Sequence, residues 1–462
     1  TLSSSSAASD VYKRQVNNIM RKLTVILRQH TPLIHFQHYQ DNATLRASEV
    51  KPQLDRFLLT QLGNGDYETG IERARIKEWL IGDGSHPALN YQMKISPMND
   101  IEMMDTNSPQ KRDGKYKMRK SRSHDNHEII SLNPYPAYFA NMDADYKNPV
   151  EYKKFSMTDY LKMTFIFKNS TNAMVALSNF INDNSQLPKF FLRTNFGTRN
   201  SKGFGSFYIA EEDPLYVSPT QLTTYTFSVN AQSMPYKDIC RGNEFEILFK
   251  VIETFYKSLR SGINEIDRQG NTMFYFKSIA YGYCTNILLK KWDKRKIKET
   301  FYNIPTTTPE ESCDIKDVFG FSTDEQWLSE RDSIKKSIAI QVGEHWRQAP
   351  AANTTVPTRL QSPLLFKPIY DEDEDVYHIY LIFKEKEVKL EEFLSYRKVH
   401  ISSREKHRSL IIDLPKEFQL QDFFSYFLDN SHFNINDHVE PQYHTHIYFD
   451  VLEDIYKQLK NI

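Results

Sequence analysis

The stretch FGTRNSKGFGSF, residues 196–207, is the strongest local departure from the composition of this chain. Three of the 15 glycines in 462 residues fall within it, beside Arg199 and Lys202. Glycine adopts positive φ and lets a backbone or a ligand approach closely, which residues with a Cβ resist. We therefore predict a loop whose backbone N–H groups and two cations contact a phosphate chain, with the faces of Phe204 and Phe207 offered to bases.

Two nucleotide-binding motifs do not fit this loop. A P-loop needs Lys and then Ser or Thr after its last glycine, whereas Phe204 follows Gly203. A Rossmann fingerprint needs a third glycine three residues after Gly205, where Tyr208 stands. A glycine-rich hairpin or bulge that binds no ligand remains the structural alternative.

The patterns that flank the loop predict an α+β domain. Alternating apolar residues indicate a strand over residues 21–30. Ser48 is expected to cap a helix that has Pro52 in its first turn and ends at Gly63. The further expected elements are strands at 160–167, 190–196 and 207–209 and a helix at 172–180. This order is compatible with the β-α-β-β-α-β pattern of a ferredoxin-like domain.

A second set of elements begins near Leu222. The expected elements are strands at 222–229, 362–369 and 378–384 and helices at 244–259 and 324–346. The acidic run 371–375 is expected to be a hairpin turn. We therefore predict two domains, residues 20–218 and 219–462.

Two segments are set apart by composition. Residues 98–127 are polar and carry seven cations: Lys111, Arg112, Lys115, Lys117, Arg119, Lys120 and Arg122. This basic segment is expected to be a mobile insertion, either a solvated loop or an arm that contacts phosphates. Residues 1–19 lack the apolar centre of a signal peptide and are expected to be a non-native or disordered leader before Met20.

Charge and cysteine content limit the class of protein. The 59 basic and 59 acidic side chains cancel, which excludes a globally basic nucleic-acid binder but permits binding through a local groove. Cys240, Cys284 and Cys313 are few and widely spaced, with no C-x-x-C pair. This usage favours a reducing compartment, so we expect a cytoplasmic protein.

The pattern Gly-x-Arg-x-x-x-Gly-Phe-Gly-x-Phe resembles the glycine-rich loop of the RAMP superfamily, the RRM-like proteins of CRISPR effector complexes. Residues 31–33, TPL, and 43–51, ATLRASEVK, are similar to the RAMP opening in which a strand ending in TPL leads to LRGSSIKGALR. Ala47 replaces the usual glycine there, and Pro52 stands where glycine is common. Residues 362–368, SPLLFKP, resemble a strand of the second RAMP domain in large type III subunits.

The resemblance implies two tandem ferredoxin-like RAMP domains, as in the large capping subunit of the type III-B (Cmr-type) effector complex. Such a subunit would hold guide RNA and help to capture target RNA in antiviral defence, alongside other effector subunits. A serine at a helix N-terminus beside two cations would also suit a phosphate, although simple capping is the alternative. The expected RNA-binding residues are Arg46, Ser48, Lys51, Gly197, Arg199, Lys202, Gly203, Phe204 and Gly205. Valine at Gly203 and Gly205 is expected to weaken RNA binding and to leave the fold intact.

The case for an enzyme rests on two histidines. Some RAMP proteins cut RNA without metal by using a histidine, and His35 and His38 follow the first expected strand. His444 and His446 could ligate a metal from one strand face, but no spacing of Cys or carboxylates completes the set. We therefore expect no catalytic residue, metal or cofactor. The alternatives are a guide-RNA-processing endoribonuclease and a protein-interaction scaffold without RNA contact.

Overall fold

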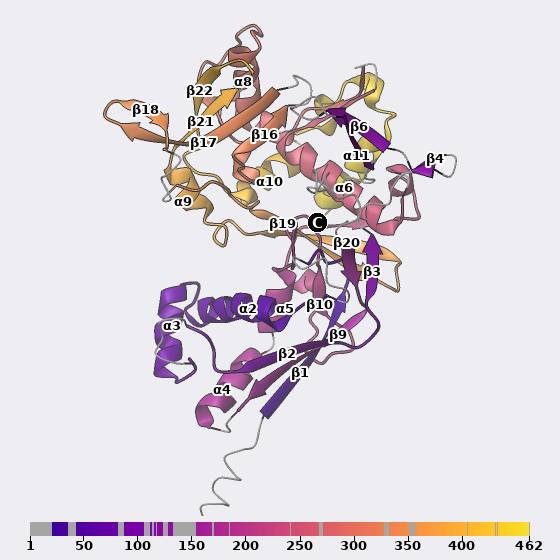
Figure 1. Cartoon of the computed structure of the whole chain (residues 1–462), viewed down its shortest axis with the longest axis vertical. Helices are drawn as coiled ribbons and strands as arrows, with labels where there is room; N and C mark the ends of the chain where they lie inside the picture. Colours follow the sequence, from indigo (N-terminus) through magenta and orange to yellow (C-terminus); the bar gives the residue numbers. More distant parts are fainter. Residues whose placement is uncertain are drawn as a thin grey trace, which may run out of the picture. The chain divides into compact units, whose positions relative to one another are not determined.

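The computed structural model divides the chain into two compact units (Figure 1). The first comprises residues 1–224 and 367–370, and the second comprises residues 225–366 and 371–462. The expected leader and His38 lie outside the described residues. The structure describes residues 21–35, 43–81, 87–105, 111–112, 115–116, 118–122, 128–132, 154–168, 171–183, 185–240, 242–267, 271–327, 332–350, 356–403, 405–429, 431 and 433–461.

The first unit contains a four-stranded antiparallel sheet. Its strands are β1 (Arg21–Gln29), β2 (Gln92–Pro97), β9 (Tyr160–Phe167) and β10 (Phe207–Ile209). Helices α2 (Ala47–Leu62) and α3 (Tyr67–Ile76) link the first two strands, and α4 (Asn172–Ile181) and α5 (Gln186–Leu192) link the last two. The strand order is β10-β1-β9-β2, with every pair antiparallel. Numbered along the chain, this order is 4-1-3-2, so the predicted ferredoxin-like fold is confirmed for this unit.

Alternation explains which face of this sheet is buried. Leu161, Met163, Phe165 and Phe167 alternate along β9 and are all fully buried. Tyr91 packs on two of these rings, with centroids 5.2 Å from Phe165 and 6.1 Å from Phe167. Helix α2 contacts β2 and α5 contacts β10, and Figure 1 labels all four elements. The apolar face is therefore covered by helices.

The prediction of a strand over residues 190–196 is wrong. Residues 186–192 form α5, which buries Leu187, Pro188, Phe190, Phe191 and Leu192. A helix this short that is apolar on most sides carries no readable 3.6-residue period, and its aromatic residues resemble those of a strand. Pro188, within the first turn, is compatible with a helix N-terminus.

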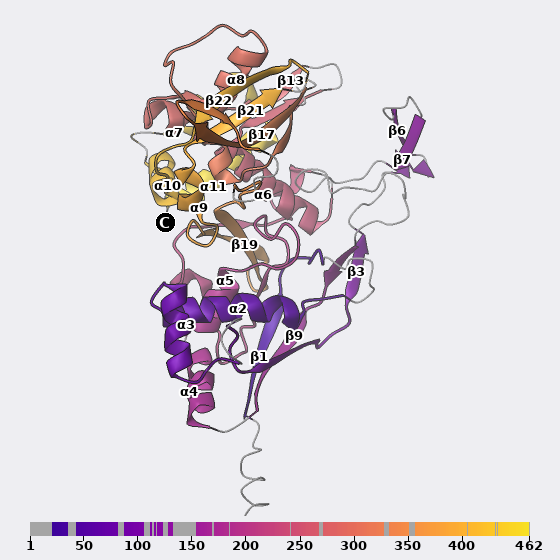
Figure 2. The same ribbon diagram turned by 60° about the vertical axis from the view of Figure 1, so that its left-hand side comes forward.

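A long insertion separates β2 from β9. Strands β3 (Glu102–Asp105) and β8 (Lys154–Met157) pair at its base. Two short hairpins lie between them: β4 (Lys111–Arg112) with β5 (Lys115–Tyr116), and β6 (Met118–Arg122) with β7 (Glu128–Leu132) (Figure 2). The side chains of the seven cations lie outside what the structure describes, so the role of the basic segment stays a prediction.

The second unit repeats part of the ferredoxin-like pattern. Its core elements are β11 (Thr226–Val229), α6 (Glu244–Arg260), β19 (Leu364–Asp371), β20 (Val376–Phe383) and α11 (Ile447–Lys460). The sheet order β11-β20-β19 is 1-3-2 along the chain. Phe255 of α6 packs on Phe227, Phe366 and Tyr456, with ring centroids 5.3, 6.2 and 5.8 Å apart. Both helices thus share one core with this sheet.

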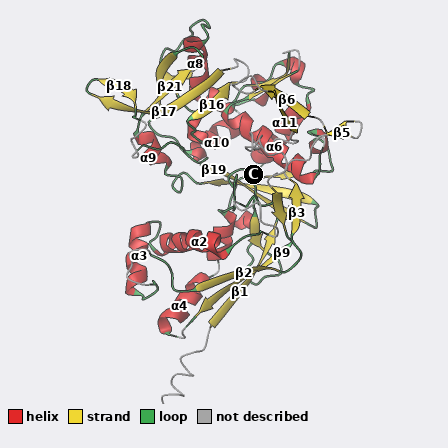
Figure 3. Ribbon diagram, in the orientation of Figure 1, coloured by secondary structure: helices red, strands yellow, loops and turns green. Residues whose placement is uncertain are grey.

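A second sheet is inserted into this unit (Figure 3), and the described residues of the first unit form no counterpart to it. Its strands are β14 (Lys291–Trp292), β15 (Ser312–Cys313), β16 (Asp324–Trp327), β17 (Asp332–Val342), β18 (His345–Gln348), β21 (Lys398–Ser403) and β22 (Arg408–Asp413). The other elements are the hairpin β12 (Ile263–Ile266) with β13 (Thr272–Phe276) and the helices α7 (Ile279–Asn286), α8 (Asp293–Phe301), α9 (Leu390–Ser395) and α10 (Leu420–Leu428). Among the described helices, none is long and apolar enough to cross a membrane.

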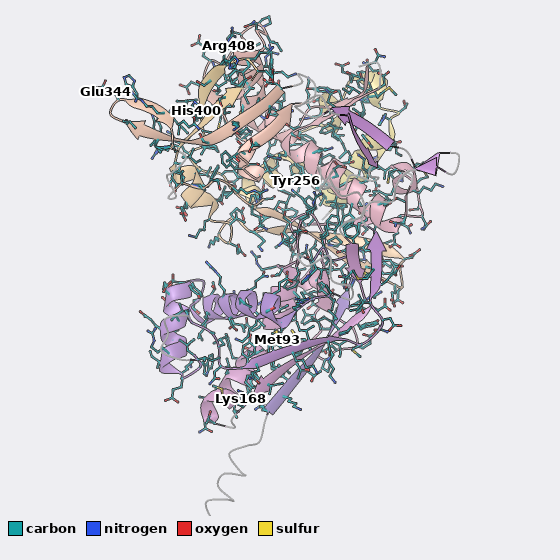
Figure 4. The ribbon with its side chains drawn as sticks, in the orientation of Figure 1. Met93, Lys168, Tyr256, Glu344, His400 and Arg408 are labelled. Atoms are coloured by element: carbon teal, nitrogen blue, oxygen red, sulfur yellow. The ribbon has the colours of Figure 1, made fainter. Side chains whose placement is uncertain are left out.

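The predicted helix over residues 324–346 is therefore wrong, because this range forms β16, β17 and the start of β18. Glu344, labelled in Figure 4, lies in the turn between the last two of these strands. Along β17 the buried residues alternate, but one of them is Lys336. Its ammonium is paired with Asp317 at 2.9 Å and with Glu325 at 2.8 Å. Because a lysine stands among the buried positions of β17, the two-residue period of a strand could not be recognised in the sequence.

Candidate nucleic-acid interface

The glycine loop, residues 196–207, is hydrogen-bonded to the segment that follows β1. Thr198 N donates to Ile34 O at 3.0 Å, and Gly205 N donates to Pro32 O at 2.9 Å. The Thr31 hydroxyl donates to Gly203 O at 2.7 Å and accepts from Ser206 N at 2.9 Å. Two motifs that lie about 170 residues apart, the TPL segment and the glycine loop, thus form one structure.

The glycines of the loop are required by the fold. Gly197, Gly203 and Gly205 have φ of +74°, +93° and +63°. A Cβ added at Gly205 would lie 2.1 Å from Phe196 O, and one added at Gly197 would lie 2.5 Å from Ile34 O. Atoms cannot approach this closely, so the expectation that valine at Gly205 leaves the fold intact is wrong.

The loop presents less to a ligand than its sequence indicates. Donors to protein acceptors are the backbone N–H groups of Gly197, Thr198, Lys202, Gly203, Gly205 and Ser206. Phe204 and Phe207 are 0% exposed, with Phe204 5.6 Å from the Phe155 ring. The expected stacking faces are therefore wrong, because these rings fill the core beneath the loop. Gly197, Arg199 and Lys202 are half-buried rather than buried.

A hydrogen bond joins the first turn of α2 to the loop. Gly197 N donates to Glu49 Oε1 at 2.8 Å. Burial raises the pKa of Glu49, against the opposing effects of this N–H group and of the Arg46 charge. The pKa of His35 is lowered by burial and by the same Arg46. Arg46, Glu49 and His35 therefore gather beside Gly197.

The other two residues expected on this helix behave differently. The residue at the N-cap is Arg46, whose side chain makes no capping hydrogen bond, so the expectation that Ser48 caps the helix is wrong. Ser48 is exposed within the first turn, and Pro52 lies inside the helix rather than in that turn. Lys51 Nζ pairs with Asp55, donates to Leu89 O at 3.0 Å and lies 4.1 Å from the centroid of the Tyr91 ring. Lys51 thus serves the packing of α2 rather than an exposed phosphate site.

One buried lysine contacts the loop and was missed in the sequence. Lys367, 0% exposed, donates from Nζ to Thr194 O at 3.0 Å and to Phe207 O at 2.7 Å. Beside it, Ser206 Oγ donates to Pro368 O at 2.6 Å. The SPLLFKP motif contains this lysine, but nothing in its sequence indicates which carbonyls the ammonium reaches.

The face of the first sheet opposite the helices is basic. It is defined here by Lys22, Thr24 and Arg28 of β1, Lys162 and Thr164 of β9, and Gln92 and Lys94 of β2, all exposed or half-buried. The same face also carries the half-buried residues Ile26, Ser96, Tyr160 and Ile166. Register places Thr24, Thr164 and Lys94 in one row across the three strands. The three strands contain no Asp or Glu, so the four cations of this basic sheet face have no carboxylate among them. The alternation that marked the buried side of β1 also marks these residues.

Of the histidines considered for chemistry, the three within the described residues, His35, His444 and His446, pack against other parts of the protein. His35 is 2% exposed. His446 is the N-cap of α11, where Nδ1 accepts from Tyr448 N at 3.2 Å, and its ring stacks 4.6 Å from Phe274. His444 stacks 4.7 Å from Phe449. The possibility that His444 and His446 ligate a metal from one strand face does not hold, because the segment is a turn followed by α11.

Two ferredoxin-like cores in one chain, the first closed by a glycine loop, define a tandem RAMP protein. The family model of the Cmr1 N-terminal domain matches residues 20–263, and that of the Cmr1 C-terminal domain matches residues 275–461. The chain therefore belongs to the Cmr1 family, which makes it a subunit of a type III-B CRISPR effector. The resemblance drawn from the glycine loop is confirmed.

Similar solved structures are distant. One is the type III-B Cmr-beta complex bound to cognate target RNA and AMPPnP, state 2, in the presence of ssDNA; a chain of it is 13% identical, with 81% of this chain and 97% of that chain covered and a TM-score of 0.31. Another is the type III-B Cmr-beta bound to cognate target RNA, at 12% identity, 94% and 99% coverage and a TM-score of 0.33. No curated protein sequence matches the chain.

Proposed function

We propose that this chain is an RNA-binding subunit of its type III-B effector, holding guide RNA and helping to capture target RNA in antiviral defence. Its partners in this role are the two RNAs and the other effector subunits. The role is one of binding, and no catalytic residue is assigned. The observation that carries the proposal is the basic sheet face.

The composition of this face suits an RNA backbone. Lys22, Arg28, Lys94 and Lys162 attract phosphates, and the three strands themselves contain no Asp or Glu. One buried carboxylate from outside the strands, Asp213, accepts from Ile26 N of β1 at 2.8 Å. Threonine and glutamine side chains between the cations can hydrogen-bond to phosphate or ribose oxygens. Tyr160 is the one aromatic residue that the register places on this face of β1, β2 and β9, so stacking on bases is a minor term. Binding that tolerates many sequences follows.

A second contact region is the junction of α2 with the glycine loop. Arg46 stands at the helix N-terminus, where the macrodipole favours anions. Arg199 lies two residues from Gly197. The N–H group of Gly197 donates to Glu49, which lies in the first turn of α2 close to Arg46. We assign Arg46 and Arg199 to this region, with Ser48 exposed beside Arg46. Lys202 is left out of this region because its Nζ atom is buried.

The experiment measures RNA affinity against salt concentration. Fluorescence anisotropy of a labelled single-stranded RNA is recorded for the wild type and for the double variant Lys94→Gln/Lys162→Gln. Each lost phosphate contact lowers the slope of log K against log salt by about 0.7, so the double variant is expected to lower it by about 1.4. Arg46→Gln and Arg199→Gln are each expected to lower it by about 0.7.

The matched control removes two cations from the helical side of the same unit. Arg75 of α3 and Lys189 of α5 are both exposed. The variant Arg75→Gln/Lys189→Gln is expected to keep the wild-type slope. Equal slopes for the control and for the sheet variant would overturn the assignment of the sheet face. Absence of any RNA binding at low salt would favour a protein-interaction scaffold instead.

The position of His35 does not support the endoribonuclease alternative. A general acid or base must reach the proton that it transfers, and this side chain is 2% exposed. The buried position and the contact of its neighbours with the glycine loop give His35 a structural role.

A further inference from the structure

The acidic hairpin between β19 and β20 carries three possible metal ligands in the second unit. Asp371 ends β19, Glu374 lies in the turn and His378 points back from β20. One ligand atom from each residue lies within 4.8 Å of the other two. His378 Nε2 is 3.6 Å from Asp371 Oδ2 and 3.7 Å from Glu374 Oε2. The sequence pattern is Asp-x-x-Glu-x-x-x-His.

Asp371 is oriented by the turn itself. Its Oδ1 accepts from Asp373 N at 2.9 Å and from Glu374 N at 3.1 Å. This arrangement fixes the carboxylate plane and turns the other oxygen, Oδ2, toward the imidazole. One oxygen therefore holds the hairpin while the second is available to a ligand.

The imidazole is oriented from outside the acidic turn. Ser228 of β11 lies directly opposite His378 in the strand pair, and its Oγ is 2.8 Å from Nδ1. Ser228 is itself held by Gln458, which accepts from Ser228 N at 2.7 Å and donates to Ser228 O at 3.1 Å. A hydrogen bond to one ring nitrogen that aims the other at a cation is the usual arrangement around metal-bound histidines.

The distances suit an ion better than direct hydrogen bonds. Nitrogen–oxygen hydrogen bonds span about 2.7–3.2 Å, so separations of 3.6 and 3.7 Å are too long for them. A tetrahedral ion with bonds of about 2.0–2.2 Å holds its ligand atoms about 3.3–3.6 Å apart. The His378–Asp371 separation of 3.6 Å lies at the upper end of this range, and the His378–Glu374 separation of 3.7 Å lies just above it. The ligand oxygens of Asp371 and Glu374 lie within 4.8 Å of each other, a gap that the exposed Glu374 side chain can close by rotation.

We propose that Asp371, Glu374 and His378 bind a divalent transition-metal ion, with Zn²⁺ as the best fit, and that Ser228 is a positioning residue for His378. An imidazole with two carboxylates favours Zn²⁺ over Mg²⁺ and Ca²⁺, which take oxygen ligands. Three protein ligands leave at least one position of the ion to water. Without metal, a protonated His378 would pair with the two carboxylates, and the experiment separates these states.

The test uses the full chain after treatment with EDTA. Zn²⁺ is titrated in competition with a chromogenic chelator, for the wild type and for His378→Gln, Glu374→Gln and Ser228→Ala. The first two variants are expected to lose one Zn²⁺ per chain, and Ser228→Ala is expected to bind it 10–100-fold more weakly. The matched control is His345→Gln, which changes an exposed histidine of β18 in the same unit and is expected to bind like the wild type.

A second readout protects the result against misfolding. The Glu374 side chain is 66% exposed, so Glu374→Gln is expected to keep the wild-type circular dichroism spectrum. Co²⁺ in a tetrahedral site absorbs visible light, and this absorption should appear in the wild type and the control but not in His378→Gln. Identical Zn²⁺ stoichiometry and Co²⁺ spectra in the wild type, His378→Gln and Glu374→Gln would overturn the proposal and leave an ion pair only.

Discussion

The substitution Gly205→Ala should destabilise the first unit through a clash with backbone. The residue has φ of +63°, and an added Cβ would lie 2.1 Å from Phe196 O and 3.0 Å from Leu33 Cδ1. The Phe196 carbonyl cannot simply move away, because Phe196 N donates to Gly205 O at 2.9 Å and Gly205 N donates to Pro32 O at 2.9 Å. Any shift that relieves the clash lengthens these two hydrogen bonds.

The expected magnitude follows from three contributions to the free energy of unfolding. The left-handed conformation costs a residue with a Cβ about 1–2 kcal/mol. An extra methyl group in a packed site costs about 1–3 kcal/mol. Weakening of two hydrogen bonds adds about 0.5–1.5 kcal/mol for each bond that is lost. We expect a total loss of about 3–5 kcal/mol, a large part of the ~5–15 kcal/mol typical of a folded domain.

The chain offers a control with the same backbone angle. Gly343, in the turn between β17 and β18, also has φ of +63°, but nothing lies within 4 Å of an added Cβ. Gly343→Ala should therefore cost only the conformational term, about 1–2 kcal/mol.

The assay is urea denaturation of the full chain followed by circular dichroism and tryptophan fluorescence. If the two units unfold in separate transitions, each variant should shift only the transition of its own unit. The loss in free energy of unfolding should be larger for Gly205→Ala than for Gly343→Ala by about 2 kcal/mol or more. Equal losses would refute the close-approach argument and leave backbone angle as the whole effect.

Two further outcomes concern buried charges. Lys367→Met should lower the free energy of unfolding by about 2 kcal/mol or more, because the carbonyls of Thr194 and Phe207 lose their buried donor. An unchanged free energy of unfolding in urea denaturation would contradict this. Burial raises the pKa of Asp293 to about 6, so the folded state holds its proton more tightly and wild-type stability falls as pH rises from about 4 to about 6. Between pH 4 and pH 6, the free energy of unfolding of Asp293→Asn should rise by up to about 3 kcal/mol relative to that of the wild type. If urea denaturation gives the same difference between the two proteins at pH 4 and at pH 7, the result would argue against this prediction.

Elements with a strong local signal were predictable from sequence. The helix expected at 244–259 is α6, which has an apolar stripe over 17 residues and a capping box between Asn243 and Glu246. The strand expected at 21–30 is β1, in which buried and less buried residues alternate from Val25 to Gln29. In both, the residues that face the core repeat at the period of the element, so no tertiary information was needed.

The failures have tertiary causes. Lys336 reads as a surface residue, yet it is buried because Asp317 and Glu325 neutralise it from other elements. The glycine loop was recognised correctly as special, but the reason was mistaken. Several of its N–H groups donate to Glu49, to the Thr31 hydroxyl, to the carbonyls of Pro32 and Ile34, and to carbonyls within the loop. Backbone acceptors leave no trace in a sequence. The basic sheet face was visible in the alternation of β1 but became evident only when β2 and β9 were placed beside it.

The discontinuity of the first unit has a consequence for how the protein is made. Thr224 and Tyr370, the ends of its two segments, are 146 positions apart in the chain. At roughly 5–20 residues per second, a ribosome needs roughly 7–30 s to travel from one to the other. During that time the nascent unit lacks Lys367, so the carbonyls of Thr194 and Phe207 do not yet accept hydrogen bonds from its ammonium. Folding of the N-terminal part is therefore completed only after most of the second unit has been synthesised.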